Sequence, residues 1–352
     1  MSLIYLPLER LEQRYTTMMY DALVPYCDLV LYPDYAIGTI ETGQFLDVNK
    51  TCAFKARQLV MVADLFAHGD ILDGDVFLVA DLFYPGIEMI RYMADLQGIE
   101  VYIAGFSYAG RADPTDFVQR LGDWSDYSEA GYLTAADLIF VGSQAHRCQT
   151  HVYFRKHFNL DLWSRLQVTG YIWDMEWVRD VWRPGTRDKE DFVVWPHRLC
   201  HEKGADLLVA YAEHTDKHIV VTSCGTAHPG EWGLPGNVEL RFGLTKAQYY
   251  ETLDRARWYL STARQETFGY TLQEAIVYGC QVLVPNVACY PEMVPKINVY
   301  NLFPDALTQA LEINGLYEVH DDALVVPLGY TEKWHNNTAV VLEKVKTLCA
   351  SI

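Results

Sequence analysis

At 352 residues the chain is long enough for two domains, because a single hydrophobic core stops growing before that length. Half of the residues are hydrophobic and 13% are aromatic, which excludes a disordered chain and favours a folded globular protein. The formal net charge of −18 argues against a protein that binds nucleic acid through a generally basic surface.

Cysteine usage and hydropathy bear on the compartment. No uninterrupted apolar run approaches the roughly 20 residues of a membrane span, and the start MSLIYLPLERLEQR lacks a signal peptide's basic beginning and long apolar core. The eight cysteines are scattered without a CxxC pair, which argues for reduced thiols and against a zinc ribbon or a disulfide framework. We therefore expect a cytoplasmic protein.

Short apolar runs in the first half of the chain alternate with helical patterns. Strands are expected at residues 4–6, 29–32, 76–80, 101–104, 138–141 and 166–170, helices at 11–23, 53–65 and 144–158, and irregular structure at 33–51. This alternation predicts an α/β domain with a parallel sheet. Ligands of such sheets lie at the carboxyl ends of the strands.

Charged side chains lie near the ends of two of these strands. Asp81 follows strand 76–80, where it could take part in chemistry or simply cap the next segment. Glu9 and Arg14 lie near the start of the helix 11–23, as ligand contacts or as surface charges.

Two further segments of the first half carry candidate groups. The loop GFSYAGRADPTDF after strand 101–104 offers the polar side chains Ser107, Arg111 and Asp113, although Asp113-Pro114 could form a turn. The helix 144–158 bears basic residues among aromatic ones, and these could contact a phosphate backbone or form a solvated face. They are Arg147, His151, Arg155, Lys156 and His157.

A charged stretch with Pro-Gly, VRDVWRPGTRDKED at 178–191, predicts a boundary between domains 1–178 and 192–330. Strands of a second sheet are expected at 192–194, 219–222, 238–242, 258–262 and 282–284, and helices from Ala205, at 245–255, at 270–278 and in the tail 331–348. Gly279 would end the helix 270–278 as a C′ glycine.

The stretch 261–292, STARQETFGYTLQEAIVYGCQVLVPNVACYPE, combines a strand end, a tight loop, a helix and another strand. Glu266 lies in the loop, and Glu274 follows eight positions later on the helix side that continues from it. Backbone N–H groups of residues 268–271 open the helix and could hold an anion. Carboxylates on either side would accept hydroxyl hydrogen bonds, which suits a sugar nucleotide, although an ordinary βα unit with two solvated glutamates has the same pattern.

A second motif is WPHRLCHEKG at 195–204. Arg198 and Lys203 surround a short loop before a helix, an arrangement that suits a diphosphate, because Arg donates two parallel hydrogen bonds and Lys adds a compact charge. His197 and His201 are four residues apart, but no third ligand is evident and no metal site is expected.

These motifs resemble known families. The spacing of Glu266 and Glu274 resembles the Glu-x7-Glu signature of retaining glycosyltransferases with the GT-B fold, and the Arg198 and Lys203 segment is similar to their donor-phosphate motif. The run STAxxExFG…EAxxYGC…LxPNxxxYPE and the HRxxxxK core are locally similar to the tRNA-queuosine mannosyltransferases. The opening YLPLE…RYT resembles glycosyltransferases of bacteriophages, which would place the protein in a host cytoplasm.

The GT-B resemblance implies an α/β fold of two Rossmann-like domains facing a central cleft, with the C-terminal helix, within 331–352, packing back on the first domain. It also implies that Glu266 contacts the donor sugar and Glu274 the nucleotide ribose. Further donor contacts, many through backbone groups, are implied for Phe242, Thr267, Phe268, Gly269, Tyr270 and Thr271.

The resemblance further implies a retaining transfer in which Arg198, Lys203 and the helix N-terminus at Gly269 stabilise the departing diphosphate in place of a divalent ion. Glu266 would position the sugar and Asp81 would lie near the acceptor. No metal or cofactor is expected, and the donor is a substrate such as a UDP- or GDP-sugar. Acceptor-side contacts are expected from Glu9, Arg14, Ser107, Arg111 and Asp113.

The acceptor is left open by the sequence. The likeness to a tRNA-modifying family and to phage enzymes favours a hydroxymethylated pyrimidine in phage DNA as the acceptor, and a saccharide or another small molecule is the alternative. Because the protein is acidic, affinity for nucleic acid would have to come from a local patch such as residues 147–157. A sugar-nucleotide epimerase or a silent binding module of the same architecture are the alternatives from other classes.

Overall fold

The computed structural model describes residues 1–11, 14–35, 48–84, 86–222, 232–302 and 337–350, with the short pieces 309, 312–313, 315–316 and 324–327. These residues form two compact units, each with its own hydrophobic core. The first unit contains the described residues up to Asp174 together with 337–350, and the second contains those from Met175 to 327.

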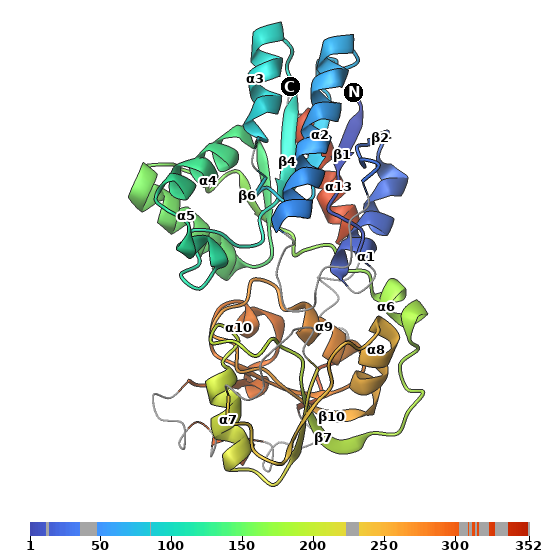
Figure 1. Ribbon diagram of the computed structural model, residues 1–352, viewed down its shortest axis with the longest axis vertical. Helices are drawn as coiled ribbons and strands as arrows, with labels where there is room; N and C mark the ends of the chain where they lie inside the picture. Colours follow the sequence, from blue (N-terminus) through green and yellow to red (C-terminus); the bar gives the residue numbers. More distant parts are fainter. Residues whose placement is uncertain are drawn as a thin grey trace. The chain divides into compact units, whose positions relative to one another are not determined.

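The first unit is built on a six-stranded sheet in the order β2-β1-β3-β4-β5-β6 (Figure 1), and every neighbouring pair is parallel. Because β1 lies between β2 and β3, the strand order reverses direction there, and ligands of such sheets bind at the carboxyl ends of the strands at this reversal. The strands are β1 (Leu3–Leu6), β2 (Leu29–Val30), β3 (Val76–Val79), β4 (Tyr102–Phe106), β5 (Leu138–Val141) and β6 (Leu166–Val168).

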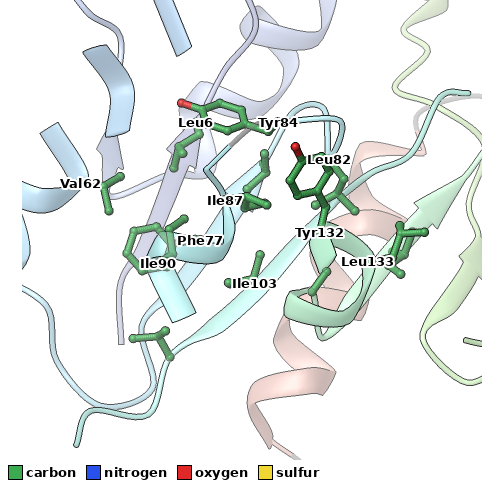
Figure 2. Packing of buried hydrophobic residues seen from close by; sticks show 14 of the residues in the cluster. Leu6, Val62, Phe77, Leu82, Tyr84, Ile87, Ile90, Ile103, Tyr132 and Leu133 are labelled. Atoms are coloured by element: carbon green, nitrogen blue, oxygen red, sulfur yellow. The ribbon is translucent and has the colours of Figure 1, made fainter. Parts of the chain in front are cut away.

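Helices cover this sheet and supply its core. Figure 2 shows side chains of the helices α2, α3 and α4 packed around Phe77 and Ile103 of the central strands. This packing removes the apolar side chains from water, which stabilises the fold. The helices are α1 (Tyr15–Leu23), α2 (Val48–His68), α3 (Glu88–Gln97), α4 (Trp124–Ala135) and α5 (Gln144–Phe158), with 3₁₀ turns η1 (Val24–Tyr26) and η2 (Phe117–Arg120).

Two predicted helices of this unit were wrong in their bounds. Helix α1 begins only at Tyr15, with Arg14 as its N-cap residue, whereas residue 11 was expected to start it. Helix α2 begins at Val48, inside the segment predicted to be irregular, and it continues to His68 because no helix breaker intervenes before Gly69, whose φ is 74°. Helices α3 and α4 were not predicted.

The second unit also has a six-stranded parallel sheet, in the order β12-β11-β10-β7-β8-β9. The strand order reverses between β7 and β10, and ligands of such sheets bind at the carboxyl ends of the strands at this reversal. The strands are β7 (Glu190–Trp195), β8 (His218–Val221), β9 (Val238–Leu240), β10 (Ala256–Leu260), β11 (Gln281–Pro285) and β12 (Val299–Tyr300).

Local signals fix the helices of the second unit. Thr245 and Gln248 form a capping box at the start of α8, and Gly279, at a φ of 67°, ends α9 as predicted. Among the described helices, none combines the length and apolar character needed to cross a bilayer. The helices are α6 (Met175–Val181), α7 (Ala205–Glu213), α8 (Lys246–Arg255), α9 (Tyr270–Val277) and α10 (Tyr290–Met293), with the 3₁₀ turn η4 (Lys296–Asn298).

The C-terminal helix α13 (Thr338–Ala350) returns to the first unit, as expected (Figure 1). It contacts β5. Asn337, just before it, accepts a hydrogen bond from the Trp173 amide at 3.0 Å and donates to the carbonyls of Thr169, at 3.1 Å, and Tyr171. The predicted residues 331–336 of this helix lie outside the described residues.

Candidate functional site

Two loops of the second unit meet where the strand order reverses: residues 196–204 follow β7 and residues 261–269 follow β10. The Thr262 hydroxyl accepts a hydrogen bond from Trp195 Nε1 at 2.9 Å and lies 2.9 Å from the Gly204 carbonyl oxygen, to which it can donate. A Cβ atom at Gly204 would lie 2.1 Å from the Thr262 carbonyl oxygen, so only glycine allows the loops to approach this closely.

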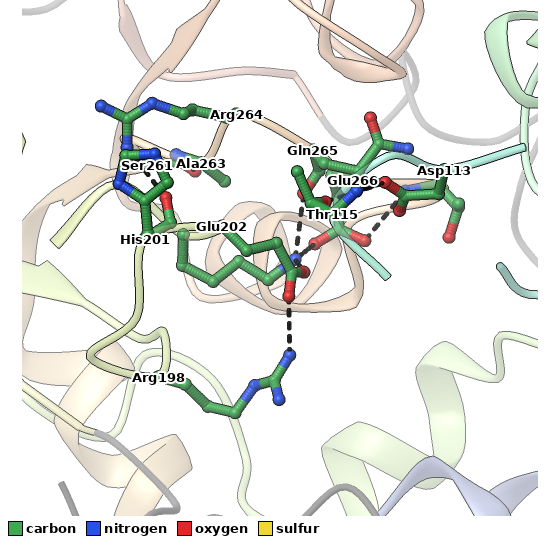
Figure 3. A network of polar contacts seen from close by, with 12 residues as sticks. Asp113, Thr115, Arg198, His201, Glu202, Ser261, Ala263, Arg264, Gln265 and Glu266 are labelled. Atoms are coloured by element: carbon green, nitrogen blue, oxygen red, sulfur yellow. Dashed lines mark hydrogen bonds and ion pairs between the residues drawn. The ribbon is translucent and has the colours of Figure 1, made fainter. Parts of the chain in front are cut away.

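Charged side chains from both loops form one chain of ion pairs (Figure 3). Lys203 Nζ lies 3.3 Å from Glu266 Oε2 and 2.8 Å from Glu202 Oε1, and it donates to the Gln265 carbonyl at 3.0 Å. Arg198 Nη2 lies 3.2 Å from the other oxygen of Glu202. The structure therefore brings together Arg198, Lys203 and Glu266, three residues selected from the sequence.

The pKa values of Glu266, Lys203 and the neighbouring His197 are all shifted from their usual ranges. Burial raises the pKa of Glu266, but the Lys203 ammonium and other neighbours lower it more, and the net pKa is below its usual range. Burial lowers the pKa of Lys203, but Glu266 and Glu202 raise it, and the net pKa lies above its usual range. Burial, with help from Lys203, lowers the pKa of His197 to about 3. At neutral pH the site thus holds a carboxylate, an ammonium and a neutral imidazole.

The N-terminus of α9 adjoins Glu266. Gly269 is the N-cap residue with a φ of 75°, none of the described side chains caps the helix, and its first turn contains no acidic residue. A Cβ atom at Gly269 would lie 3.7 Å from Cγ of Glu266, which places that carboxylate beside the helix start. The positive end of the helix dipole and the two cations suit an anion at this point.

Glu274 lies in the second turn of α9 and is held by α8. Its Oε1 accepts from Lys246 Nζ at 2.7 Å and from the Tyr250 hydroxyl at 3.0 Å, and its Oε2 accepts from the Tyr249 hydroxyl at 2.8 Å. The side chain of Glu274 is only 5% exposed. Sequence reasoning missed these three donors, although their i, i+3 and i+4 spacing places them on one helix face.

The other expected donor-side residues surround the same helix start or follow β9. Thr267 donates its amide to Glu266 Oε1 at 3.1 Å, the Thr271 hydroxyl lies 3.1 Å from the Tyr259 hydroxyl, and Phe268 is buried with its ring 5.2 Å from that of Tyr270. Phe242 is 37% exposed and lies just beyond the end of β9, outside the strand predicted for it.

Three acceptor-side candidates of the first unit are engaged within it. Asp81 pairs with Lys55 at 3.1 Å and accepts from the Phe83 amide at 3.0 Å. Arg111 forms two hydrogen bonds with Asp126, at 2.7 and 2.8 Å, and Asp113 Oδ1 accepts from both the amide and the hydroxyl of Thr115, each at 2.8 Å. These contacts stabilise loops. The hydrogen bond from the Phe83 amide to Asp81 corresponds to the capping role that the sequence allowed for Asp81.

Glu9 differs from those three. It lies beyond the carboxyl end of β1, next to the reversal of strand order, and it is only 4% exposed. Its Oε1 has no hydrogen-bond partner within the part of the chain that the structure describes. Ser107 is buried, and Arg14 donates its amide to the Leu11 carbonyl at 2.9 Å. Among the acceptor-side candidates, Glu9 is thus the one whose buried carboxylate oxygen lacks a hydrogen-bond partner among the described residues.

The basic helix α5 is partly committed to the protein itself. The Arg147 guanidinium lies 3.8 Å from the centre of the Trp163 ring and donates to the Trp163 carbonyl at 2.7 Å. Exposed positive or titratable groups remain at Arg155, Lys156 and His157. Among the described residues, no group of three or more His, Cys, Asp or Glu side chains is placed to hold a metal ion.

Comparisons with known proteins place the fold. No protein-family model matches the chain. A stretch of 130 residues is 35% identical to a tRNA-queuosine alpha-mannosyltransferase of Drosophila melanogaster, and it covers 34% of this chain and only 34% of that protein.

Solved structures match along the whole chain. Sucrose-phosphate synthase of Thermosynechococcus elongatus has a TM-score of 0.64 and 14% identity, with coverage of 100% of this chain and 97% of that one. HepE of Anabaena, solved with UDP-glucose, has a TM-score of 0.65 and 14% identity, with coverage of 99% of both chains. At these identities the likeness concerns the fold, and the expected two-domain GT-B fold is confirmed.

Proposed function

We propose that this chain is a glycosyltransferase that moves a sugar from a nucleotide-sugar donor to an acceptor hydroxyl with retention of anomeric configuration. The observation that carries the proposal is the cluster of Arg198, Lys203 and Glu266 beside the N-terminus of α9, at the strand reversal of the second unit. The fold supports it, and so do similar structures, such as that of HepE in complex with UDP-glucose.

Arg198 and Lys203 bind the diphosphate of the donor. Both cations contact Glu202, which lies 3.2 Å from Arg198 and 2.8 Å from Lys203. A diphosphate supplies more negative charge and more acceptor oxygens than one carboxylate, so it would displace these contacts. As the bond between the sugar and the diphosphate breaks, the cations and the dipole of α9 stabilise the charge that develops on the leaving oxygen.

Glu266 positions the sugar. Because its pKa is lowered, it is ionised at neutral pH and accepts hydrogen bonds from sugar hydroxyls. The acceptor hydroxyl attacks the anomeric carbon from the face that the diphosphate leaves, and its proton passes to the departing phosphate oxygen. Asp81 and Glu9 are the first-unit carboxylates assigned to the acceptor side, and Glu9 is favoured because its Oε1 has no hydrogen-bond partner among the described residues. The two cations and the dipole of α9 offset the charge that develops in this step, so the proposed step uses no metal ion or cofactor.

For the acceptor, we propose a hydroxyl on a modified nucleoside in nucleic acid. The support is the local match to a protein named for transfer to tRNA queuosine, together with the exposed Arg155, Lys156 and His157. A hydroxymethylated pyrimidine in phage DNA fits the same description. A saccharide acceptor remains the rival, because the net charge of −18 disfavours tight binding to nucleic acid.

The test is transfer of label from a panel of radiolabelled UDP- and GDP-sugars. Acceptors are hydroxymethylated duplex DNA, unmodified DNA, tRNA with and without queuosine, and free saccharides. Label on one nucleic acid alone supports the proposal and identifies the acceptor. Label on saccharides alone keeps the transferase and overturns the nucleic-acid acceptor. Release of an altered sugar without any acceptor would instead indicate an epimerase, and donor binding without turnover would indicate a silent binding module.

A further inference from the structure

The loop that follows β10 holds the turn that carries Lys203. Arg264, in this loop, donates its amide to the Glu202 carbonyl at 2.9 Å and its guanidinium Nη1 to the His201 carbonyl at 2.8 Å. We propose that Arg264 is a positioning residue of the donor site, whose guanidinium fixes the turn 201–204 and thereby holds the Lys203 ammonium in place for the diphosphate. This inference rests on the proposed function, in which Lys203 binds the diphosphate.

Four consecutive carbonyl groups, those of residues 201–204, lie within hydrogen-bond distance of donors in the loop after β10. The first two accept from Arg264, and the last two lie 3.0 and 2.9 Å from the Thr262 hydroxyl. Thr262 can donate to only one of them at a time, because a hydroxyl has a single hydrogen. Arg264 therefore donates more hydrogen bonds to these carbonyls than Thr262 does at any one time.

The Arg264 guanidinium also reaches the first turn of α7. Its Nη1 and Nη2 donate to the two carboxylate oxygens of Asp206, at 2.7 and 2.6 Å, and these bonds hold the pKa of Asp206 below its usual range. Figure 3 shows Arg264 next to His201. Because His201 and Asp206 lie on either side of Lys203 in the chain, one rigid, planar group bridges the residues that flank Lys203.

These side-chain contacts should matter more for the site than for the stability of the fold. Arg264 and Asp206 are 27% and 45% exposed, and exposed ion pairs contribute little to the free energy of unfolding. Lys203 is only 13% exposed, and its Nζ lies 3.3 Å from Glu266, so a small shift of the turn misplaces a mostly buried charge. A surface ion pair without a positioning role would instead leave ligand binding unchanged.

The experiment is calorimetric titration of the full chain with UDP, GDP and ADP, after which the tightest binder is used with each variant. Arg264→Ala keeps the amide bond to Glu202 and should weaken binding about tenfold, because a hydrogen bond from the charged Lys203 to the ligand is misaligned. Arg255→Ala is the matched control, since Arg255 also binds a carboxylate, that of Glu190, through two nitrogens, at 2.7 and 3.1 Å, but outside both loops. It should stay within about twofold of wild type. The midpoint of thermal unfolding should fall no further in Arg264→Ala than in this control.

A double-mutant cycle tests whether Arg264 acts through Lys203. Lys203→Met alone should weaken binding about tenfold or more. Adding Arg264→Ala to it should change binding by less than about twofold, because the group that Arg264 positions is already absent. Arg264→Lys keeps the charge but loses the planar fork, so it should restore only part of the affinity that Arg264→Ala loses.

The outcomes separate this inference from the proposed function. If none of the three nucleotides binds, the proposed function is overturned. If a nucleotide binds and Arg264→Ala stays within about twofold of wild type, or weakens binding by the same factor with and without Lys203, the positioning role is overturned while the proposed function stands. Equal losses of affinity in Arg264→Ala and Arg255→Ala would also overturn the positioning role.

Discussion

The Lys203 and Glu266 side chains form the ion pair at the centre of the candidate donor site. They are 13% and 20% exposed, so each has lost most of its hydration and depends on the other for compensation. The pair also sets both charges at neutral pH, since each partner shifts the pKa of the other toward the ionised form. A donor that binds here meets charges that are already in place.

Lys203→Met should therefore destabilise the protein by about 1–3 kcal/mol at pH 7, because a buried carboxylate loses its charged partner. In the wild type, a lowered Glu266 pKa contributes stability above the unfolded-state pKa near 4.3, and the contribution is lost as the pH falls through the folded-state value. The stability difference between wild type and variant should thus be full at pH 7 and shrink toward pH 3. Urea unfolding at several pH values measures it.

The control for this variant is Lys217→Met. Lys217 lies 3.5 Å from Asp191, whose side chain is 66% exposed, so the pair should contribute at most about 1 kcal/mol. A difference in stability between wild type and Lys203→Met that stays constant from pH 7 to pH 3 would contradict the assigned coupling between Lys203 and Glu266.

Single residues also show what the sequence could and could not provide. The residue types and spacing of Arg198, Lys203 and Glu266 selected them, and the structure brings them together. The partners of Glu274 and Asp81 could not be predicted, because Lys246 and Lys55 lie 28 and 26 positions away and only the folded chain makes them neighbours.

Among the elements, the two loops that carry the site depend on one close approach. Gly204 has a φ of 68°, and a Cβ atom at this position would lie 2.1 Å from the Thr262 carbonyl oxygen. Lys203 precedes this glycine directly and α7 follows it. Displacement of the loop would therefore move the Lys203 ammonium away from Glu266.

Gly204→Ala should cost about 1–3 kcal/mol for the backbone strain and about 1–3 kcal/mol more for the clash, and it should abolish nucleotide binding. Gly279→Ala is the matched control, because Gly279 has a φ of 67° but no atom of the described residues lies within 4 Å of the added Cβ atom. Thermal unfolding and nucleotide titration measure both effects. Equal losses of stability in the two variants, with nucleotide binding intact, would show that the close approach is unimportant.

Elements with strong local signals were predicted well. The bounds of β5 and α5 match those expected, since an apolar run and the Ser143 cap mark them. Strand β12 is two residues long, too short for a period-two pattern, and pairing with β11 is what orders it. The sequence thus located the sheets, but short edge strands depend on tertiary contacts.

At the scale of the whole molecule, the two units have separate cores, and the C-terminal helix stabilises the first. Asn337 is fully buried and bonds three backbone groups near β6. The second unit has a counterpart in Asn237, whose Nδ2 donates to the carbonyls of Ala212, Thr215 and Lys217 at 3.1, 3.0 and 3.1 Å. These two asparagines allow each unit to be perturbed separately.

Asn337→Ala should cost about 2–4 kcal/mol, because it leaves buried backbone groups without partners. Hydrogen exchange should show lost protection in β5, β6 and α13, with α7 and β8 unchanged. Asn237→Ala should give the reverse pattern. Equal loss of protection in both units from either variant would contradict the assignment of separate cores.

The most direct test of the proposed transferase is the transfer rate of Glu266→Gln and Arg198→Ala, measured with the donor and acceptor identified from the panel. In the proposed mechanism each removes a group that stabilises the reacting sugar or diphosphate, so rates should fall roughly 100-fold or more. Arg255→Ala, which removes only an exposed pair with Glu190 in the same unit, should stay within about twofold of wild type. Rates near wild type for both Glu266→Gln and Arg198→Ala would contradict a donor site at this cluster.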